Sequence, residues 1–320
     1  MNATASQAQL LIDCANTFGA CARWSERHQR VFWTDVDEQL LYSASAHGTA
    51  LETIPLPDRL SAFAFDQLGR LVCAFFDGVY LFDLETGERR QIASFEPRLP
   101  TTRTNDGSCD RDGWFVVGGC EQSSGQPLSS IRSYAMDDES ILIRSIGRAR
   151  GIAFSLTGET MYFADETRAL IYRLPYQETG NLVGQLGKPT AFAELRAGEG
   201  NPGGSCIDSE DALWNAQFGG HAVQRFLQDG TRDARVHVPV AHVTSCCFGG
   251  PKLDVMFITT ARAAMTHAQL KTHPCAGGLF VATPGVLGVP EALFDSTDGR
   301  YFQPAWATLA AGRRSLEPRE

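Results

Sequence analysis

The side chains best suited to chemistry in this sequence are arginines and amides that lie close together. Arg103 and Asn105 stand two positions apart in the run Arg103-Thr-Asn-Asp-Gly107, which is unusually polar for a strand-like segment, and Arg150 follows 45 residues after Asn105. Burying two guanidinium groups is costly unless they meet an anion or other hydrogen-bonding groups. These residues therefore predict a site that binds the anionic or hydroxyl oxygens of a small molecule.

Histidines and cysteines could also carry chemistry, but few of them are spaced to do so. The chain has nine cysteines and no Cys-x-x-Cys pair, so neither a zinc ribbon nor a thioredoxin-like motif is expected. Most of these cysteines lie in apolar strand-like runs, where a free cysteine packs as a small hydrophobic residue. A reduced, cytoplasmic protein is therefore predicted. His242 could offer a ring nitrogen near the site, and the alternative that it is an ordinary strand-end histidine stays open.

A strand–turn–strand pattern that occurs six times must position these residues. The apolar anchors of the pattern are spaced by 41, 44, 45, 53 and 41 residues; they are Trp24, Phe65, Cys109, Phe154, Ile207 and Phe248. Each unit continues into a third strand, and fourth strands are expected near 90–95 and 191–195. Four strands in about 40–50 residues is the length of a β-propeller blade, whereas a β-sandwich has no such long period.

The sequence therefore predicts an all-β protein, a six-bladed β-propeller that forms a single domain over residues 1–320. About the first 8 residues, and the residues after about 312, are expected to be peripheral. Helix is scarce, and a short connecting helix over 264–271 is the best candidate. Because the innermost strand of every blade lines the central channel, equivalent positions in these strands should form a ring.

The predicted ring lies four residues before each anchor; its members are Ala20, Ser61, Asn105, Arg150, Gly203 and Thr244. Polar groups at a channel mouth are typical of a small-molecule site. Ser61, Thr244, Asn105 and the nearby Arg103 are therefore predicted to bind substrate. The alternative is that these polar side chains only satisfy backbone groups at the strand ends.

Composition limits the classes of partner. The chain has 28 Lys+Arg against 37 Asp+Glu, so its formal net charge is −9. The sequence has no excess of Lys and Arg to form the basic surface that nucleic acid or an anionic membrane needs. No apolar run approaches the ~18 residues of a membrane span. A small-molecule partner is expected, and the sequence leaves the oligomeric state open.

Several segments resemble the senescence-marker-protein/gluconolactonase (regucalcin-like) family. The matching segments run in order along the chain; they are 19–24, 103–107, 151–155 with 162–165, 208–214, 219–226, 244–250, 257–262 and 277–280. The resemblance implies a six-bladed propeller, in agreement with the repeat count. It also implies a role in carbohydrate metabolism, the hydrolysis of sugar lactones, with one divalent cation such as Ca, Zn or Mn in the channel.

The sequence departs from this family at the metal site. The positions of the three family ligands fall on Ala20, Arg150 and Gly203, so no metal cofactor is expected. The family's substrate-positioning arginine and asparagine do match, as Arg103 and Asn105. Asp106 and Glu199 are the nearby carboxylates, but neither occupies a ring position.

Two hypotheses follow. The first is a divergent hydrolase of a sugar lactone, in which Arg150 stands where the metal sat and binds the developing oxyanion. Another base must then activate water, and His242, Glu199 and Asp106 are the candidates. The second is a non-catalytic propeller that binds a sugar acid or another small carboxylate. The loss of the three ligands would also fit an engineered variant.

Overall fold

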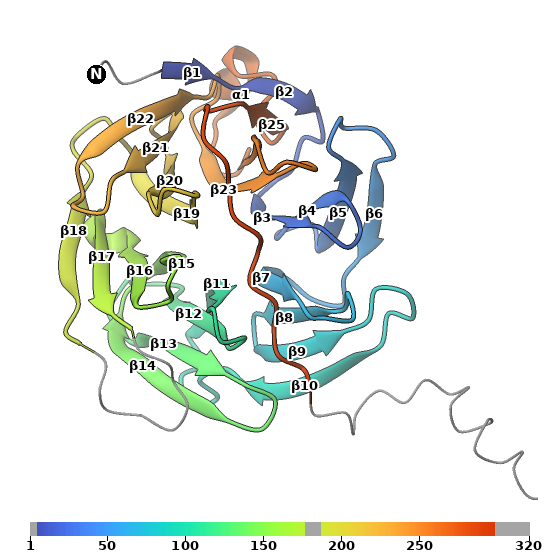
Figure 1. The fold of residues 1–320 in the computed structure, drawn as a ribbon, viewed down its shortest axis with the longest axis vertical. Helices are drawn as coiled ribbons and strands as arrows, with labels where there is room; N and C mark the ends of the chain where they lie inside the picture. The colour runs from blue at the N-terminus through green and yellow to red at the C-terminus, as the bar shows by residue number, and fades with distance from the viewer. Residues whose placement is uncertain (1–4, 177–186, 298–320) are drawn as a thin grey trace, which may run out of the picture.

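Six sheets, antiparallel except for one parallel strand pair, surround a central channel in the computed structural model, which describes residues 5–176 and 187–297 (Figure 1). The six-bladed β-propeller predicted from the repeat is confirmed. The first three blades each have four strands in chain order; they are β3 (Gly19–Ser25), β4 (Arg30–Asp35), β5 (Leu40–Ser45) and β6 (Glu52–Pro55); β7 (Leu60–Phe65), β8 (Leu71–Phe75), β9 (Gly78–Phe82) and β10 (Arg89–Ser94); and β11 (Thr102–Cys109), β12 (Phe115–Glu121), β13 (Ser129–Tyr134) and β14 (Glu139–Ile146).

The fourth blade follows the same order, and the last two blades each recruit one strand from the N-terminal end. The fourth contains β15 (Ala149–Phe154), β16 (Thr160–Asp165), β17 (Leu170–Pro175) and β18 (Thr190–Glu194); the fifth β19 (Asn201–Ile207), β20 (Leu213–Phe218), β21 (Ala222–Phe226), β22 (Arg232–His237) and β1 (Ala5–Gln7); and the sixth β23 (Val243–Gly249), β24 (Val255–Thr260), β25 (Leu279–Ala282) and β2 (Gln9–Ile12).

The N-terminal strands close the ring. β1 pairs in parallel with β22 and β2 pairs antiparallel with β25, so each forms the outermost strand of its blade. Because β2 belongs to the last blade and the chain continues from it into β3 of the first blade, the N-terminal segment ties the last blade to the first. Residues 5–12 thus lie at the periphery and complete two sheets, whereas residues 1–4 and 298–320 lie outside the described part.

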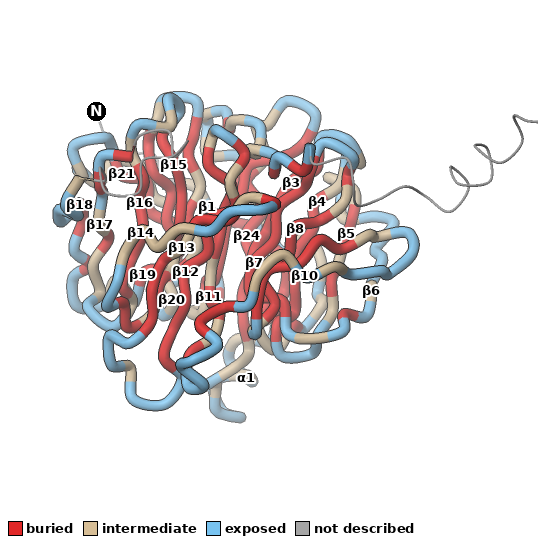
Figure 2. Tube along the Cα trace, turned by 90° about the horizontal axis from the view of Figure 1, so that it is seen from below, coloured by how far each residue is buried: buried red, intermediate tan, exposed pale blue. Residues whose placement is uncertain are grey.

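The core lies between the blades, because both faces of the inner strands are covered. β7 and β23 are buried along their whole length, whereas the outer strands β6 and β10 alternate between exposed and half-buried positions. Figure 2 shows buried strands through the middle of the molecule and exposed turns at both ends. All six repeat anchors are buried near the ends of the inner strands.

The pairing of each inner strand is irregular at the height of the predicted ring. The pairing register with the second strand shifts at or beside the ring position in all six blades; the shifts lie between Ala20/Arg23, Leu60/Ala62, Thr104/Asp106, Arg150/Ala153, Pro202/Ser205 and Val243/Ser245. A bulge of this kind turns a side chain away from the regular alternation. In blade four it includes Gly151 at φ +60°, a conformation that favours glycine.

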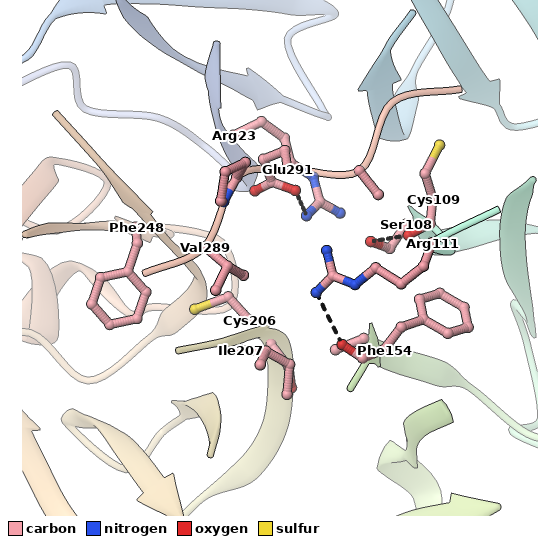
Figure 3. A pocket seen from close by; sticks show the side chains of 14 residues that line it. Arg23, Ser108, Cys109, Arg111, Phe154, Cys206, Ile207, Phe248, Val289 and Glu291 are labelled. Carbon is pink, nitrogen blue, oxygen red and sulfur yellow. Dashed lines mark hydrogen bonds and ion pairs between the residues drawn. The ribbon is translucent and has the colours of Figure 1, made fainter. Parts of the chain in front are cut away.

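The segment 283–297, named the strap here, crosses the end of the channel at which the inner strands finish (Figure 1). Its backbone bonds to Ser209 and Leu253 on one side, and to Phe65 and Gly113 on the other. Arg23 donates from Nη1 to Glu291 Oε2 of the strap at 3.0 Å (Figure 3) and from Nη2 to the carbonyl of Gly107. The strap therefore leaves only a small cavity of about 40 Å³ at this end.

Helix is scarce, as predicted. The α-helix α1 (His267–Thr272) begins three residues later than expected, because the Thr266 side chain caps it by accepting a hydrogen bond from Gln269 N. A short 3-10 helix, η1 (Glu166–Arg168), follows β16. Among the described residues, no helix has the length and apolar character needed to cross a membrane.

Candidate functional site

A pocket opens at the end of the channel opposite the strap. Its volume is about 260 Å³, and its walls come from the first residues of the inner strands and from the connections at the same end; the lining residues are Phe18, Ala20, Val36, Asp37, Arg59, Ser61, Phe76, Arg103, Asn105, Gln122, Arg148 and Arg150. We call this the mouth pocket. Its size suits a small sugar-like molecule rather than a polymer.

Four of the six predicted ring positions line the mouth pocket, together with Arg103, and two do not. Thr244 is only 3% exposed, and its hydroxyl lies 2.9 Å from the hydroxyl of Thr259. Ser61 lines the pocket, but its hydroxyl donates to the carbonyl of Ala74 at 2.9 Å and lies 2.7 Å from the Thr104 hydroxyl. The structure therefore gives Thr244 and Ser61 internal partners, and the predicted substrate contact of Thr244 has no support from its position.

Arg103 and Asn105 form a rigid pair on β11. Nη1 of Arg103 donates to the Thr104 carbonyl at 2.7 Å and to Oδ1 of Asn105 at 3.0 Å, while Nδ2 of Asn105 donates to the Ala149 carbonyl at 2.8 Å. The guanidinium of Arg103 lies over the Phe76 ring, 4.1 Å from its centroid. Stacking and hydrogen bonding fix the plane of this guanidinium. Its Nε and Nη2 have no hydrogen-bond partner within the described residues.

Arg150 is held by a carboxylate that the sequence analysis did not identify. Its Nε lies 2.5 Å from Oε2 of Glu166, at the start of η1, and Arg148 Nη1 lies 3.5 Å from Oε1 of the same carboxylate. Burial opposes ionisation of Glu166, but the positive charges of Arg150 and Arg148 outweigh it and hold the pKa of Glu166 below its usual value. Glu166 is therefore a charged anchor that leaves both Nη groups of Arg150 without a partner in the described part of the chain.

Other pocket residues were missed for a clear reason. Arg148 lies directly before β15, two residues from Arg150, and the alternation Arg148-Ala-Arg150 in an extended segment is a signal that could have found it. Arg59 and Phe76 lie in connections outside the repeat anchors, so a search limited to equivalent inner-strand positions passed over them.

The three candidate bases have different surroundings. Asp106 accepts hydrogen bonds from the backbone N–H groups of Gly107 and Gly151, and burial raises the pKa of its carboxyl group. Glu199 is bound by Arg232, whose Nε and Nη2 lie 3.0 and 2.7 Å away. Both carboxylates therefore already hold other parts of the chain in place.

His242 stacks on Phe218 with ring centroids 4.3 Å apart, and Phe218 in turn stacks on Phe18 of the pocket wall. Its Nδ1 lies 3.0 Å from the carbonyl of Ala263, which can only accept, so Nδ1 carries the proton and Nε2 has the free lone pair. Burial lowers the pKa of His242, which keeps the imidazole neutral at pH 7. The ring is a competent base, but it lies outside the set of residues that line the mouth pocket.

The positions of the family metal ligands do not fit a divalent cation. Ala20 and Gly203 have no ligand atom, and Arg150 is itself a cation. A Cβ atom at Gly203 would lie 2.7 Å from the carbonyl oxygen of Thr244, so the strand leaves no room for a carboxylate there without a backbone shift. Within 5–176 and 187–297, no group of three or more His, Cys, Asp or Glu side chains is placed to hold a metal ion.

Comparisons with known proteins identify the family of this chain. Residues 18–262 match the SMP-30/Gluconolactonase/LRE-like region. The chain is 34% identical to an L-arabinolactonase of Azospirillum brasilense, over 92% of this chain and 97% of the relative, and 28% identical to a 6-deoxy-6-sulfogluconolactonase of Pseudomonas putida, over 87% and 95%. A solved structure of the calcium-binding protein regucalcin from Agrobacterium tumefaciens superposes with a TM-score of 0.85 at 27% identity, covering 91% of this chain and 99% of that one. The chain therefore belongs to the SMP-30/gluconolactonase/LRE-like family.

Proposed function

We propose that this protein hydrolyses a sugar lactone in the mouth pocket without a divalent metal. The observation that carries the proposal is the fixed position of Arg150, whose guanidinium is clamped by Glu166 beside Arg103 and Asn105. Relatives over nearly the whole chain are named as lactonases. The L-arabinolactonase supports a neutral aldonolactone, such as arabinolactone or gluconolactone, as the first substrate to test.

The chemistry is the addition of water to an ester carbonyl. The attacking water loses a proton, the carbonyl oxygen gains negative charge, and the ring C–O bond then breaks with protonation of the leaving alcohol, which yields a sugar acid. The free Nη groups of Arg150 would donate to the developing oxyanion. Arg103 and Asn105 would bind the sugar and hold its carbonyl toward Arg150.

Asp37 and His242 are the two candidates to accept the proton of the attacking water. Asp37 lines the pocket, and His242 has a free Nε2 lone pair behind the aromatic wall. Asp106 and Glu199 are less suited, because both already accept hydrogen bonds from the protein. We assign the base to His242, which would act through an intervening water, and the variants Asp37→Asn and His242→Asn distinguish the two groups.

The test is hydrolysis of a panel of aldonolactones with and without a chelator, corrected for spontaneous hydrolysis. We expect turnover that a chelator leaves unchanged, and that falls by about 100-fold or more in Arg150→Met, the scale seen when one oxyanion donor is lost. Arg144→Met, on the exposed outer strand β14, is the matched control. Turnover that a chelator abolishes, or that Arg150→Met retains, contradicts the proposal.

A second candidate is a propeller that binds a sugar acid without turnover. It is favoured by the wall of the mouth pocket, where Asp37 is the one carboxylate among the lining residues and His242 lies outside. Binding of aldonates that raises the melting temperature, with no hydrolysis of any lactone in the panel, would support this candidate over the first.

We also place the protein in the cytoplasm. All nine of its cysteines are free thiols, and six of them are buried. Free thiols in this number are typical of proteins in a reducing compartment.

A further inference from the structure

The mouth pocket is positively charged, although the chain as a whole is acidic. Four arginines line it, at positions 59, 103, 148 and 150, against the single lining carboxylate of Asp37. Glu166 adds a second negative charge through its pairs with Arg148 and Arg150. Four positive and two negative groups leave a formal charge of +2 at this site, in a chain of net charge −9.

The positive charge is unevenly compensated. Arg148 and Arg150 share Glu166, whereas Arg59 and Arg103 have no carboxylate within ion-pair distance among the described residues. Both stack on Phe76, with their guanidinium carbons 5.0 and 4.1 Å from the ring centroid. One side of the pocket therefore presents two uncompensated guanidinium groups around a single aromatic ring.

We infer that the substrate carries a second, anionic oxygen group besides its lactone, and that Arg103 and Arg59 bind this group. The inference rests on the lactonase function proposed above, because Arg150 is needed for the lactone carbonyl. This anionic group is a carboxylate, sulfonate or phosphate at the end of the sugar away from the reacting carbonyl. Such a group matches the planar donors of a guanidinium that is already held in place.

The surroundings of Arg103 support this assignment. Burial lowers the pKa of Arg103, and the charges of Arg150, Arg148 and Arg59 lower it further. The pocket thus holds like charges together with too little internal compensation, and an anionic ligand would relieve their repulsion. A neutral sugar would leave these charges as they are.

The experiment compares matched lactones that differ only at carbon 6. D-glucono-1,4-lactone is the neutral reference; D-glucaro-1,4-lactone, 6-phospho-D-gluconolactone and 6-deoxy-6-sulfo-D-gluconolactone carry the three anionic groups. We expect kcat/KM for at least one acidic lactone to exceed the neutral value by about ten- to a hundredfold, the range for a charge-assisted hydrogen bond. The acidic lactone whose kcat/KM exceeds the neutral value by the largest factor identifies the anionic group.

Two variants locate the contact. Arg59→Gln and Arg103→Gln should each reduce the acidic-to-neutral ratio by about tenfold, and Arg59 is exposed, so its substitution leaves the fold intact. Arg144→Gln on β14 makes the same charge change far from the pocket and should keep the ratio. A ratio below twofold for all acidic lactones, or one that Arg59→Gln and Arg103→Gln both preserve, overturns the inference and leaves the lactonase proposal standing.

A binding arm keeps the inference testable if no lactone is hydrolysed. Calorimetric titration with D-glucarate and D-gluconate compares the diacid with the monoacid of the same sugar. Tighter binding of D-glucarate by tenfold or more, lost in Arg59→Gln, supports the acidic subsite even where the lactonase proposal fails. Equal affinity for the two acids, or no binding of either, overturns it.

Discussion

Glu166→Gln tests how the candidate site is held together. Glu166 and Arg150 have side chains that are 16% and 15% exposed, and the same carboxylate also pairs with Arg148. Removing one partner of a buried ion pair typically costs about 3–5 kcal/mol. Glutamine keeps one acceptor oxygen, and some solvent reaches the pair. We therefore expect the free energy of unfolding to fall by about 2–3 kcal/mol, which is within the range for breaking a buried network of hydrogen bonds and ion pairs.

Urea denaturation at pH 7, followed by circular dichroism, measures this loss. The pKa of Glu166 is lowered in the folded protein, so its stabilising contribution is present above the pKa of the unfolded chain. That contribution disappears as the pH falls through the lower, folded pKa. The difference between the wild type and Glu166→Gln should therefore shrink as the pH approaches 3.

Glu139→Gln is the matched control, because the Glu139 side chain is 49% exposed and its Oε1 lies 3.6 Å from Nη1 of Arg132. An exposed pair of this kind contributes about 0–1 kcal/mol. A double-mutant cycle of Glu166→Gln with Arg150→Met should give a coupling of at least about 1 kcal/mol. A loss at pH 7 below about 0.5 kcal/mol, or a loss that is the same at pH 3 and pH 7, would refute the view that Glu166 clamps Arg150 as a charged group.

Three further predictions concern the strap, the ring and the base. Glu291→Gln should lower the free energy of unfolding by about 2 kcal/mol, because it leaves Arg23, 9% exposed, as a buried charge without its carboxylate; an unchanged urea midpoint contradicts this. Gly203→Asp should cost about 1–3 kcal/mol and bind no divalent cation, since its Cβ meets the Thr244 carbonyl at 2.7 Å; a stable variant that titrates one equivalent of metal would overturn the argument. For hydrolysis, kcat/KM should rise with pH through a pKa below 6.5, because burial lowers the pKa of His242 and only the neutral ring accepts a proton; the same rise in His242→Asn rules this base out.

The repeated features of this protein could be predicted from its sequence. Six anchors spaced by 41 to 53 residues predicted six blades. The positions four residues before the anchors predicted a ring, and four of them, Ala20, Ser61, Asn105 and Arg150, line the mouth pocket. Both results depend on the repeat period. Blades whose strands and turns have similar lengths produce a regular spacing of equivalent residues along the chain. The missing ligand atoms at Ala20 and Gly203 are likewise a matter of residue type alone.

Only the tertiary structure decided how the charges are compensated. Arg150 and Glu166 are 16 residues apart and meet because β15 pairs with β16, which places Arg150 opposite Ala164, two residues before Glu166. Arg23 and Glu291 are 268 residues apart and meet because the strap crosses the channel. Ion pairs and close backbone contacts depend on distances between elements that have no fixed spacing in the chain, so the sequence determined which groups the site contains, and the packing of the blades determined which of those charges are left free for a ligand.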